Sequence, residues 1–203
     1  MKPLIITDID GTILDSEKRR YQSLVELLGT IPAQEMKAYD LPGLTDEQRT
    51  SFFQIFHSGK YTYLDRPLKN AAETLNWAVS KGIAIAYITG RPSLEGRNML
   101  PSTMDWLKTH EFPIPDQETV HLFLKEVDGP KDEFLKECLP KARALGFPIC
   151  GIGDTPEDAC SYISDSLPAL ILNTHQFPEN KFPRGTLRMK NWETIKDWIQ
   201  KNG

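Results

Sequence analysis

The fold of this chain is decided by the segment Leu4–Thr12, which reads LIITDIDGT. A short apolar run ends in Asp8 and Asp10, and Gly11 follows directly. Residues i and i+2 of an extended chain project to the same side, so the two carboxylates are expected side by side. Such like charges are costly unless a cation or a shared proton relieves them. The segment therefore indicates either an oxygen-ligand site for Mg²⁺ beside a nucleophile or acid–base pair, or a polar strand exit.

The composition is that of an ordinary globular protein. The chain has 203 residues, 39% of them hydrophobic and 26% charged, which fits one or two domains. Its net charge of −4 lacks the excess of positive charge that is typical of nucleic-acid-binding proteins. The one basic run, Lys18-Arg19-Arg20, is interpreted as a solvated helix face.

The lack of a recognisable targeting signal and the pattern of cysteines favour a cytoplasmic protein. The amino terminus lacks the apolar stretch of a signal peptide, and no apolar run approaches the about 18 residues of a membrane span. Cys138, Cys150 and Cys160 are odd in number and lack zinc-ligand spacing. We interpret them as reduced packing cysteines of a cytoplasmic protein without a membrane partner. The oligomeric state is left open.

Strand-like runs alternate with helical segments, which predicts βαβ units. The expected strands are Leu4–Thr7, Ile83–Ile88, Val120–Leu124, Pro148–Ile152 and Ala169–Leu172. Helices are expected over Pro67–Val79 and Lys131–Leu145, from the capping pattern Thr155–Asp158, and after a cap at Asn191. The predicted fold class is α/β, with a doubly wound, Rossmann-like parallel sheet.

One interval breaks this alternation. Residues 16–66 contain no strand of the core type, but Tyr21–Leu28 and Thr45–His57 have helical spacing. We therefore expect a small α-helical cap over 16–66, inserted in a core made of 1–15 and 67–203.

Polar residues follow the predicted strands at the edge where parallel sheets bind ligands. Asp8 and Asp10 follow the first strand, and Thr89-Gly90 follows the second. Asp154 follows the fourth strand, and Asp158 comes one helical turn later. Lys131 begins the helix after the third strand.

These residues resemble the motifs of the haloacid dehalogenase superfamily, in particular its phosphatase-like members. The first motif, Asp-x-Asp-Gly-Thr, matches 8–12, and the fourth, Gly-Asp-x-x-x-Asp, matches 153–158. The second motif, a Thr or Ser after an apolar strand, matches Thr89. For the third-motif lysine we prefer Lys131, with Lys125 as the alternative. The resemblance covers residues 2 to about 172, and the insertion occupies the place of a family cap.

The resemblance implies a phosphatase that works through an aspartyl-phosphate intermediate. Asp8 would be the nucleophile, and Asp10 would protonate the leaving oxygen and then activate water. Thr89, Gly90 and Lys131 would bind the transferring phosphoryl group. The resemblance also implies an Mg²⁺ cofactor. Its ligands would be the Asp8 carboxylate, the Asp10 backbone carbonyl and Asp154, with Asp158 binding directly or through water.

Asp10 favours phosphoryl transfer, because the dehalogenating members that this chain resembles lack an acid there. A phosphomutase would use the same four motifs, and a catalytically silent phosphate-binding protein is a further alternative. A dinucleotide-binding module is disfavoured, because Asp154 directly follows Gly151-Ile152-Gly153 and would repel a pyrophosphate. The expected substrate is a small phosphorylated metabolite, whose identity the sequence leaves open.

Overall fold

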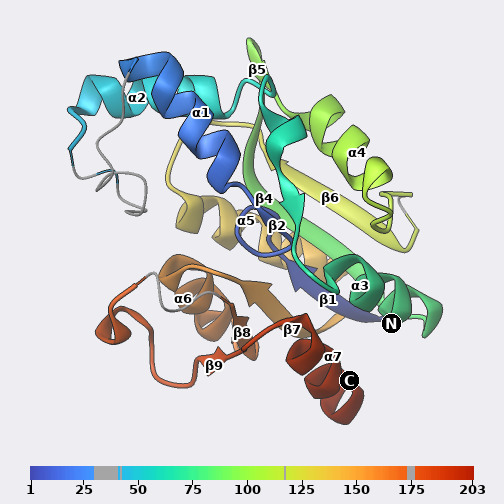
Figure 1. Cartoon of the computed structure of the whole chain (residues 1–203). Helices are drawn as coiled ribbons and strands as arrows, with labels where there is room; N and C mark the ends of the chain where they lie inside the picture. The colour runs from blue at the N-terminus through green and yellow to red at the C-terminus, as the bar shows by residue number, and fades with distance from the viewer. Residues whose placement is uncertain (30–40, 42, 117, 173–176) are drawn as a thin grey trace.

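A computed structural model describes residues 1–29, 41, 43–116, 118–172 and 177–203. It consists of a central sheet with helices on both faces (Figure 1). The strands are β1 Pro3–Thr7, β2 Leu14–Asp15, β3 Arg66–Pro67, β4 Ala84–Leu94, β5 Arg97–Asn98, β6 Val120–Lys125, β7 Phe147–Gly153, β8 Ala169–Ile171 and β9 Leu187–Arg188. The α-helices are α1 Glu17–Leu28, α2 Asp46–Phe56, α3 Ala71–Ser80, α4 Leu100–Thr109, α5 Lys131–Leu145, α6 Pro156–Ser164 and α7 Trp192–Asn202.

The sheet is doubly wound around β1. Strands β4 and β7 flank β1 in parallel, β6 extends the sheet beyond β4, and β8 and β9 extend it beyond β7. Among the strands described for this sheet, only β5 runs antiparallel, as a short hairpin with the end of β4. The chain thus reverses its direction of growth at β1, and ligands bind outside the carboxyl ends of the strands at such a point. The predicted fold class is confirmed.

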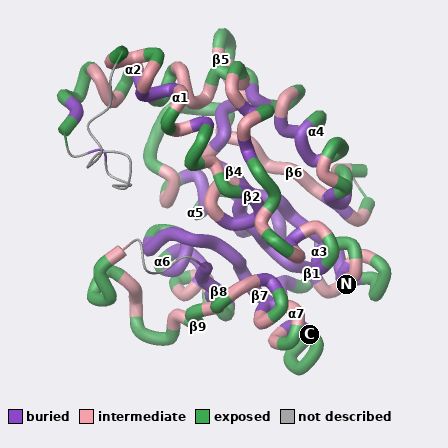
Figure 2. Tube along the Cα trace, in the orientation of Figure 1, coloured by how far each residue is buried: buried purple, intermediate pink, exposed green. Residues whose placement is uncertain are grey.

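Alternation along β1 buries both faces of the sheet. Ile5 packs into a cluster with side chains of α3, α4 and α7. Leu4 and Ile6 point to the other face and pack with side chains of α5 and α6. All three are fully buried, which gives the continuous apolar run typical of a parallel strand (Figure 2). This packing fixes where β1 ends, and therefore where Asp8 emerges.

Helices α1 and α2 pack on one another away from the sheet (Figure 1). Their contact contains a small cluster of its own, built from Leu24 and Phe52 together with Leu41 and Leu44. The segment leaves and rejoins the rest of the chain through the antiparallel pair of β2 and β3. Residues 30–40 and 42 of the predicted cap lie outside the described residues. The assignment of 16–66 as a separate cap stays a prediction.

Most predicted elements lie where the sequence places them. Helix α5 has the predicted bounds, and the Thr155 and Asn191 caps of α6 and α7 are confirmed. The predicted start of a helix at Pro67 is wrong, because Pro67 pairs with Leu14 in the β2–β3 ribbon. The helix begins only at α3, after Asn70 has turned the backbone through a φ of 66°.

Two predictions about side chains and strand length are also wrong. Strand β4 continues through Thr89 to Leu94, so Thr89 lies within the strand and not after it. Arg19 is fully buried, and its guanidinium pairs with the carboxylates of Asp10 and Asp65. Cys138 and Cys150 are buried as predicted, whereas Cys160 is exposed. Within the described ranges no helix has the length and apolarity needed to cross a membrane.

Candidate active site

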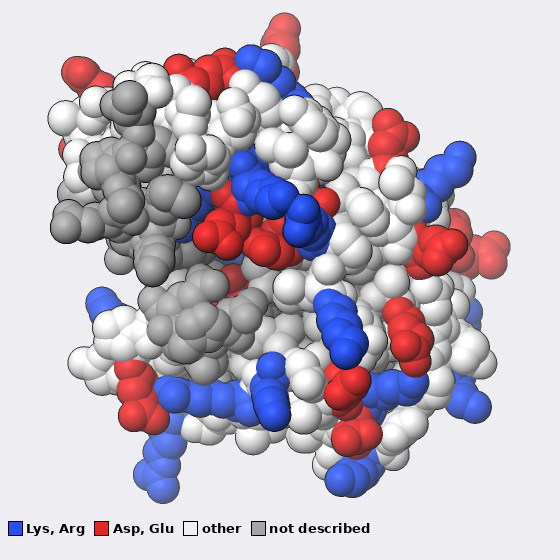
Figure 3. All heavy atoms as spheres, viewed as in Figure 1, with Lys and Arg blue, Asp and Glu red and all other residues white. Residues whose placement is uncertain are grey.

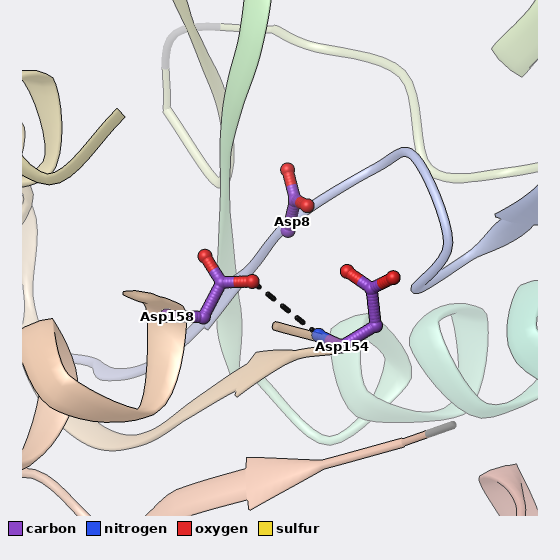
Figure 4. Close-up of side chains that lie close together, drawn as sticks. All are labelled: Asp8, Asp154 and Asp158. Atoms are coloured by element: carbon purple, nitrogen blue, oxygen red, sulfur yellow. Dashed lines mark hydrogen bonds between the residues drawn. The ribbon is translucent and has the colours of Figure 1, made fainter. Parts of the chain in front are cut away.

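Three buried carboxylates meet at the carboxyl edge of the sheet. Asp8 follows β1, Asp154 follows β7, and Asp158 lies in the first turn of α6 (Figure 4). Each is at most 3% exposed, and one oxygen of each lies within 4.8 Å of the other two. In a space-filling view, acidic side chains gather in a hollow beneath Lys and Arg side chains (Figure 3).

Lys131 joins this cluster from the start of α5. Its Nζ lies 2.8 Å from Asp8 Oδ2 and 2.9 Å from Asp158 Oδ1. The alternative, Lys125, donates instead to the Gly129 carbonyl oxygen and is not part of the cluster. Of the two lysines that the sequence offered, the structure brings Lys131 into the site.

Two glycines make room for the acids. Gly11 has a φ of 79°, and a Cβ there would lie 1.9 Å from Asp154 Oδ2. A Cβ at Gly153 would lie 2.6 Å from the Cβ of Asp158. A side chain at Gly11 would therefore be strained and would also displace Asp154. At Gly90, by contrast, a Cβ would meet open space.

The carboxylates repel one another where water cannot screen them. Burial, only partly offset by Lys131, raises the pKa of Asp8 to about 7. Burial and the charges of Asp8 and Asp158 raise the pKa of Asp154 well above its usual value. Asp158 is held by Lys131 and by the Thr155 hydroxyl, which donates to Asp158 Oδ2 at 2.8 Å.

The cluster suits a divalent cation. Asp8 Oδ1 is buried and accepts no hydrogen bond from any described residue. Buried polar atoms are normally paired, so an unpaired carboxylate oxygen beside two further carboxylates fits a hard metal ion such as Mg²⁺. Asp8, Asp154 and Asp158 are the candidate ligands. The Asp10 side chain does not belong to the cluster, and a role for its backbone carbonyl stays a prediction.

Asp10 is instead held by two arginines. Arg91 donates from Nε to Asp10 Oδ2 at 2.8 Å and from Nη2 to Oδ1 at 3.0 Å. Arg19 Nη2 also donates to Oδ1. Burial alone would raise the pKa of Asp10, but the two guanidiniums outweigh it and hold the pKa well below its usual range. The two acids of the first motif therefore lie in opposite electrostatic environments.

Thr89 is buried on β4, beyond the residues that pair with β1. Its Oγ1 accepts a hydrogen bond from the Arg91 N–H at 3.3 Å. Thr89 and Gly90 thus lie at the same edge of the sheet as Asp8. Their contact with a phosphoryl group stays a prediction.

Sequence reasoning missed two charged residues near the site. The local pattern predicts a solvated face for Arg19, and it gives no sign of a role for Asp65. Asp65 is buried and pairs with both Arg19 and Arg91, at 3.1 Å and 3.2 Å. Thr12 was also overlooked beyond its place in the motif, and its hydroxyl donates to Asp154 Oδ1 at 3.4 Å. The sequence offered no local signal for Arg19, because helical spacing places the polar Ser23 beside it and Leu24 on another side of the helix.

Solved structures share this fold over nearly the whole chain. No protein-family model and no curated protein sequence matches the chain. A predicted phosphatase from Clostridium acetobutylicum has a TM-score of 0.71 at 12% identity and covers 99% of each chain. A haloacid dehalogenase-like hydrolase from Streptococcus pneumoniae has a TM-score of 0.66 at 18% identity, covering 96% of this chain and 97% of its own.

The chain therefore has the fold of the haloacid dehalogenase-like hydrolases. Protein Tyrosine Kinase A from Mycobacterium tuberculosis is similar as well, with a TM-score of 0.72 at 13% identity over 98% of both chains. Because a protein named as a kinase shares the fold with proteins named as phosphatases, the fold by itself does not select the reaction. The choice depends on the side chains of the site.

Replacing Gly11 separates backbone strain from the Asp154 contact. Gly11→Ala and Gly96→Ala both place a side chain at positive φ, which costs roughly 1–2 kcal/mol, but a Cβ at Gly96 meets nothing within 4 Å. We expect Mg²⁺ to raise the thermal unfolding temperature of wild type and Gly96→Ala, and to have little effect on Gly11→Ala. An equal rise in both variants would contradict the role of Asp154.

Removing the Asp8 charge should stabilise the metal-free protein at high pH. The pKa of Asp8 is about 7 in the folded chain against 3.8 for an ordinary carboxyl, so stability is lost as pH rises between these values. An amide at position 8 does not ionise. In urea denaturation with a chelator present, we expect Asp8→Asn to exceed wild type in unfolding free energy at pH 8, with the gain shrinking towards pH 4.

The control for this experiment is Asp132→Asn. The Asp132 carboxylate accepts a hydrogen bond from Lys136, which lowers its pKa, so loss of its charge should bring no gain at pH 8. A difference between Asp8→Asn and wild type that does not change with pH would contradict the repulsion described above.

Proposed function

We propose that this chain is a Mg²⁺-dependent phosphatase that hydrolyses a small phosphorylated metabolite through an aspartyl-phosphate intermediate. The observation that carries the proposal is the placement of the Lys131 ammonium against Asp8, within a cluster of three buried carboxylates. A carboxylate cannot approach a phosphate dianion without positive charge nearby. Lys131 brings one positive charge, and the three carboxylates can bind a cation that brings more.

Asp8 is the proposed nucleophile. Its Oδ2 accepts a hydrogen bond from Lys131 at 2.8 Å, which orients the carboxylate, while Oδ1 has no hydrogen-bond partner among the described residues. In the first step an Asp8 oxygen attacks phosphorus, and the bond from phosphorus to the leaving oxygen breaks. When bound to Asp8, Asp154 and Asp158, Mg²⁺ would offset the repulsion between these carboxylates and the phosphate.

Asp10 is the proposed proton carrier. With both oxygens bound by guanidiniums it is a carboxylate, which suits the second step, where a base takes a proton from the attacking water. To donate a proton to the leaving oxygen in the first step, Asp10 must first be released from at least one guanidinium and take up a proton from water. Thr89 and the Gly90 N–H are proposed to bind the transferring group.

The α1–α2 segment is proposed as a cap that selects the leaving group. Arg19 of α1 links this segment to the proposed site, because its guanidinium pairs with Asp10. Its fit to the substrate depends on side chains that face the hollow, so we expect turnover to vary more between leaving groups than affinity for phosphate does. A screen of phosphorylated metabolites measures that preference.

Hydrolysis of p-nitrophenyl phosphate tests the proposal directly. We expect activity that requires Mg²⁺, is lost with a chelator, and falls at least about 10³-fold in Asp8→Asn because the nucleophile is gone. Asp132→Asn, which removes an exposed carboxylate of α5, should retain activity. Absence of wild-type activity on p-nitrophenyl phosphate and across a metabolite screen would overturn the proposed function.

The two lysines form a matched pair for the third motif. We expect Lys131→Met to lower kcat about 10²-fold or more, since the cation beside Asp8 is lost, while Lys125→Met stays within about threefold of wild type. Steady-state kinetics with p-nitrophenyl phosphate measure both. A larger loss in Lys125→Met would reverse the assignment.

A further inference from the structure

Four charged side chains form a buried network beside the carboxylate cluster. Arg19 comes from α1, Arg91 from β4, Asp10 from the loop after β1, and Asp65 directly precedes β3. The side chains of Arg19, Arg91 and Asp65 are fully buried, whereas that of Asp10 is 23% exposed. Two of the four groups are guanidiniums and two are carboxyl groups, and Asp10 is the one whose side chain is partly exposed.

Asp65 shares both of its partners with Asp10. Arg19 Nε lies 3.1 Å from Asp65 Oδ1, while Nη2 of the same guanidinium donates to Asp10. Arg91 Nη2 donates both to Asp65 Oδ2 at 3.2 Å and to Asp10 Oδ1 at 3.0 Å. Each arginine is therefore a bridge between the two acids.

The outer members of this network are fixed by the surrounding protein. The Asp65 carbonyl oxygen accepts a hydrogen bond from Trp106 Nε1 at 3.3 Å, and Arg91 Nη1 donates to Thr103 Oγ1 at 3.0 Å. The Arg19 guanidinium lies 4.1 Å from the centre of the Phe56 ring of α2. These contacts come from α4 and α2. Asp10 is the one member of the network whose side chain is partly exposed.

Burying three charged side chains is costly, and a paired set of this kind is weak evidence for stability alone. Asp65 is not one of the three clustered carboxylates, but it contacts both guanidiniums that bind Asp10. We propose that Asp65 is a positioning residue for the reaction, acting through Arg19 and Arg91 to place the Asp10 carboxylate and to tie α1 to the catalytic edge. This inference rests on the proposed function of Asp10 as proton carrier.

A role through Asp10 predicts a dependence on the leaving group. Benzyl phosphate releases a basic alkoxide that needs a proton, whereas p-nitrophenyl phosphate of similar size releases a phenoxide that does not. The ratio kcat/KM reports only the first step, before the water attack in which Asp10 also serves. In Asp65→Asn we therefore expect kcat/KM for benzyl phosphate to fall at least about tenfold and kcat/KM for p-nitrophenyl phosphate to change less than about threefold. Asp65→Glu should recover part of the loss.

Glu26→Gln is the matched control. Glu26 also lies on α1 and pairs with Lys60 at 2.8 Å, but it has no contact with Asp10. It should leave both rates unchanged. If Asp65→Asn does not fold, Asp65→Glu, which keeps the charge but moves the carboxylate by one methylene, carries the same comparison. Equal losses on both esters, or no loss on either, would overturn the positioning role.

A second measurement works without turnover. Because Asp10 and Asp65 share the same two arginines, removal of one acid leaves the other as a partner, whereas removal of both leaves two buried cations unpaired. Urea denaturation measures the equilibrium constant for unfolding. In the double variant Asp10→Asn/Asp65→Asn this constant should rise by a larger factor than the product of the factors found in the two single variants, which is the additive expectation for the free energies. Additive effects would overturn the network, whereas an inactive wild type with a non-additive cycle would count against the proposed function only.

Discussion

Repulsion among buried carboxylates is the constraint around which this site is built. Asp8, Asp154 and Asp158 meet at the sheet edge because β1 and β7 are neighbours and end at the same level. Burial keeps water from screening them, and the raised pKa values of Asp8 and Asp154 are the result. Only Lys131 brings positive charge into direct contact with the cluster among the described side chains. An arrangement so costly without a cation is typical of a site that binds one.

The same fold gives the two acids of the first motif different chemistry. They are two residues apart and emerge from one strand, yet burial raises the pKa of Asp8, whereas Arg19 and Arg91 lower that of Asp10. A nucleophile beside a metal and a proton carrier need such a division, because two groups in one environment would titrate together. The division depends on residues from outside the core motifs. Arg19 comes from the helical segment, and Arg91 also pairs with Asp65.

Local pattern explains which parts could be predicted from the sequence. The α5 helix, the Thr155 cap and the convergence of Asp8, Asp154 and Lys131 follow from signals within a few residues, combined with the rule that parallel strands bind ligands at their carboxyl ends. Where a long-range partner overrides the local signal, prediction fails. Pro67 would suit a helix start, but Leu14 pairs with it across the base of the helical segment. Likewise, the apolar pattern that predicts a strand ends before Thr89, but β4 continues because its last residues pair with β5 in a hairpin.

Arg19 shows the limit most clearly. Within Lys18-Arg19-Arg20 nothing local distinguishes a solvated cation from a buried one, because the deciding partners, Asp10 and Asp65, are distant in sequence. A buried arginine is tolerated only where carboxylates accept hydrogen bonds from its guanidinium. Its burial therefore depends on where those carboxylates lie. The helical segment and the carboxyl edge of the sheet are consequently joined by ion pairs. Any movement of α1 relative to the sheet must stretch or break the contact that holds Asp10.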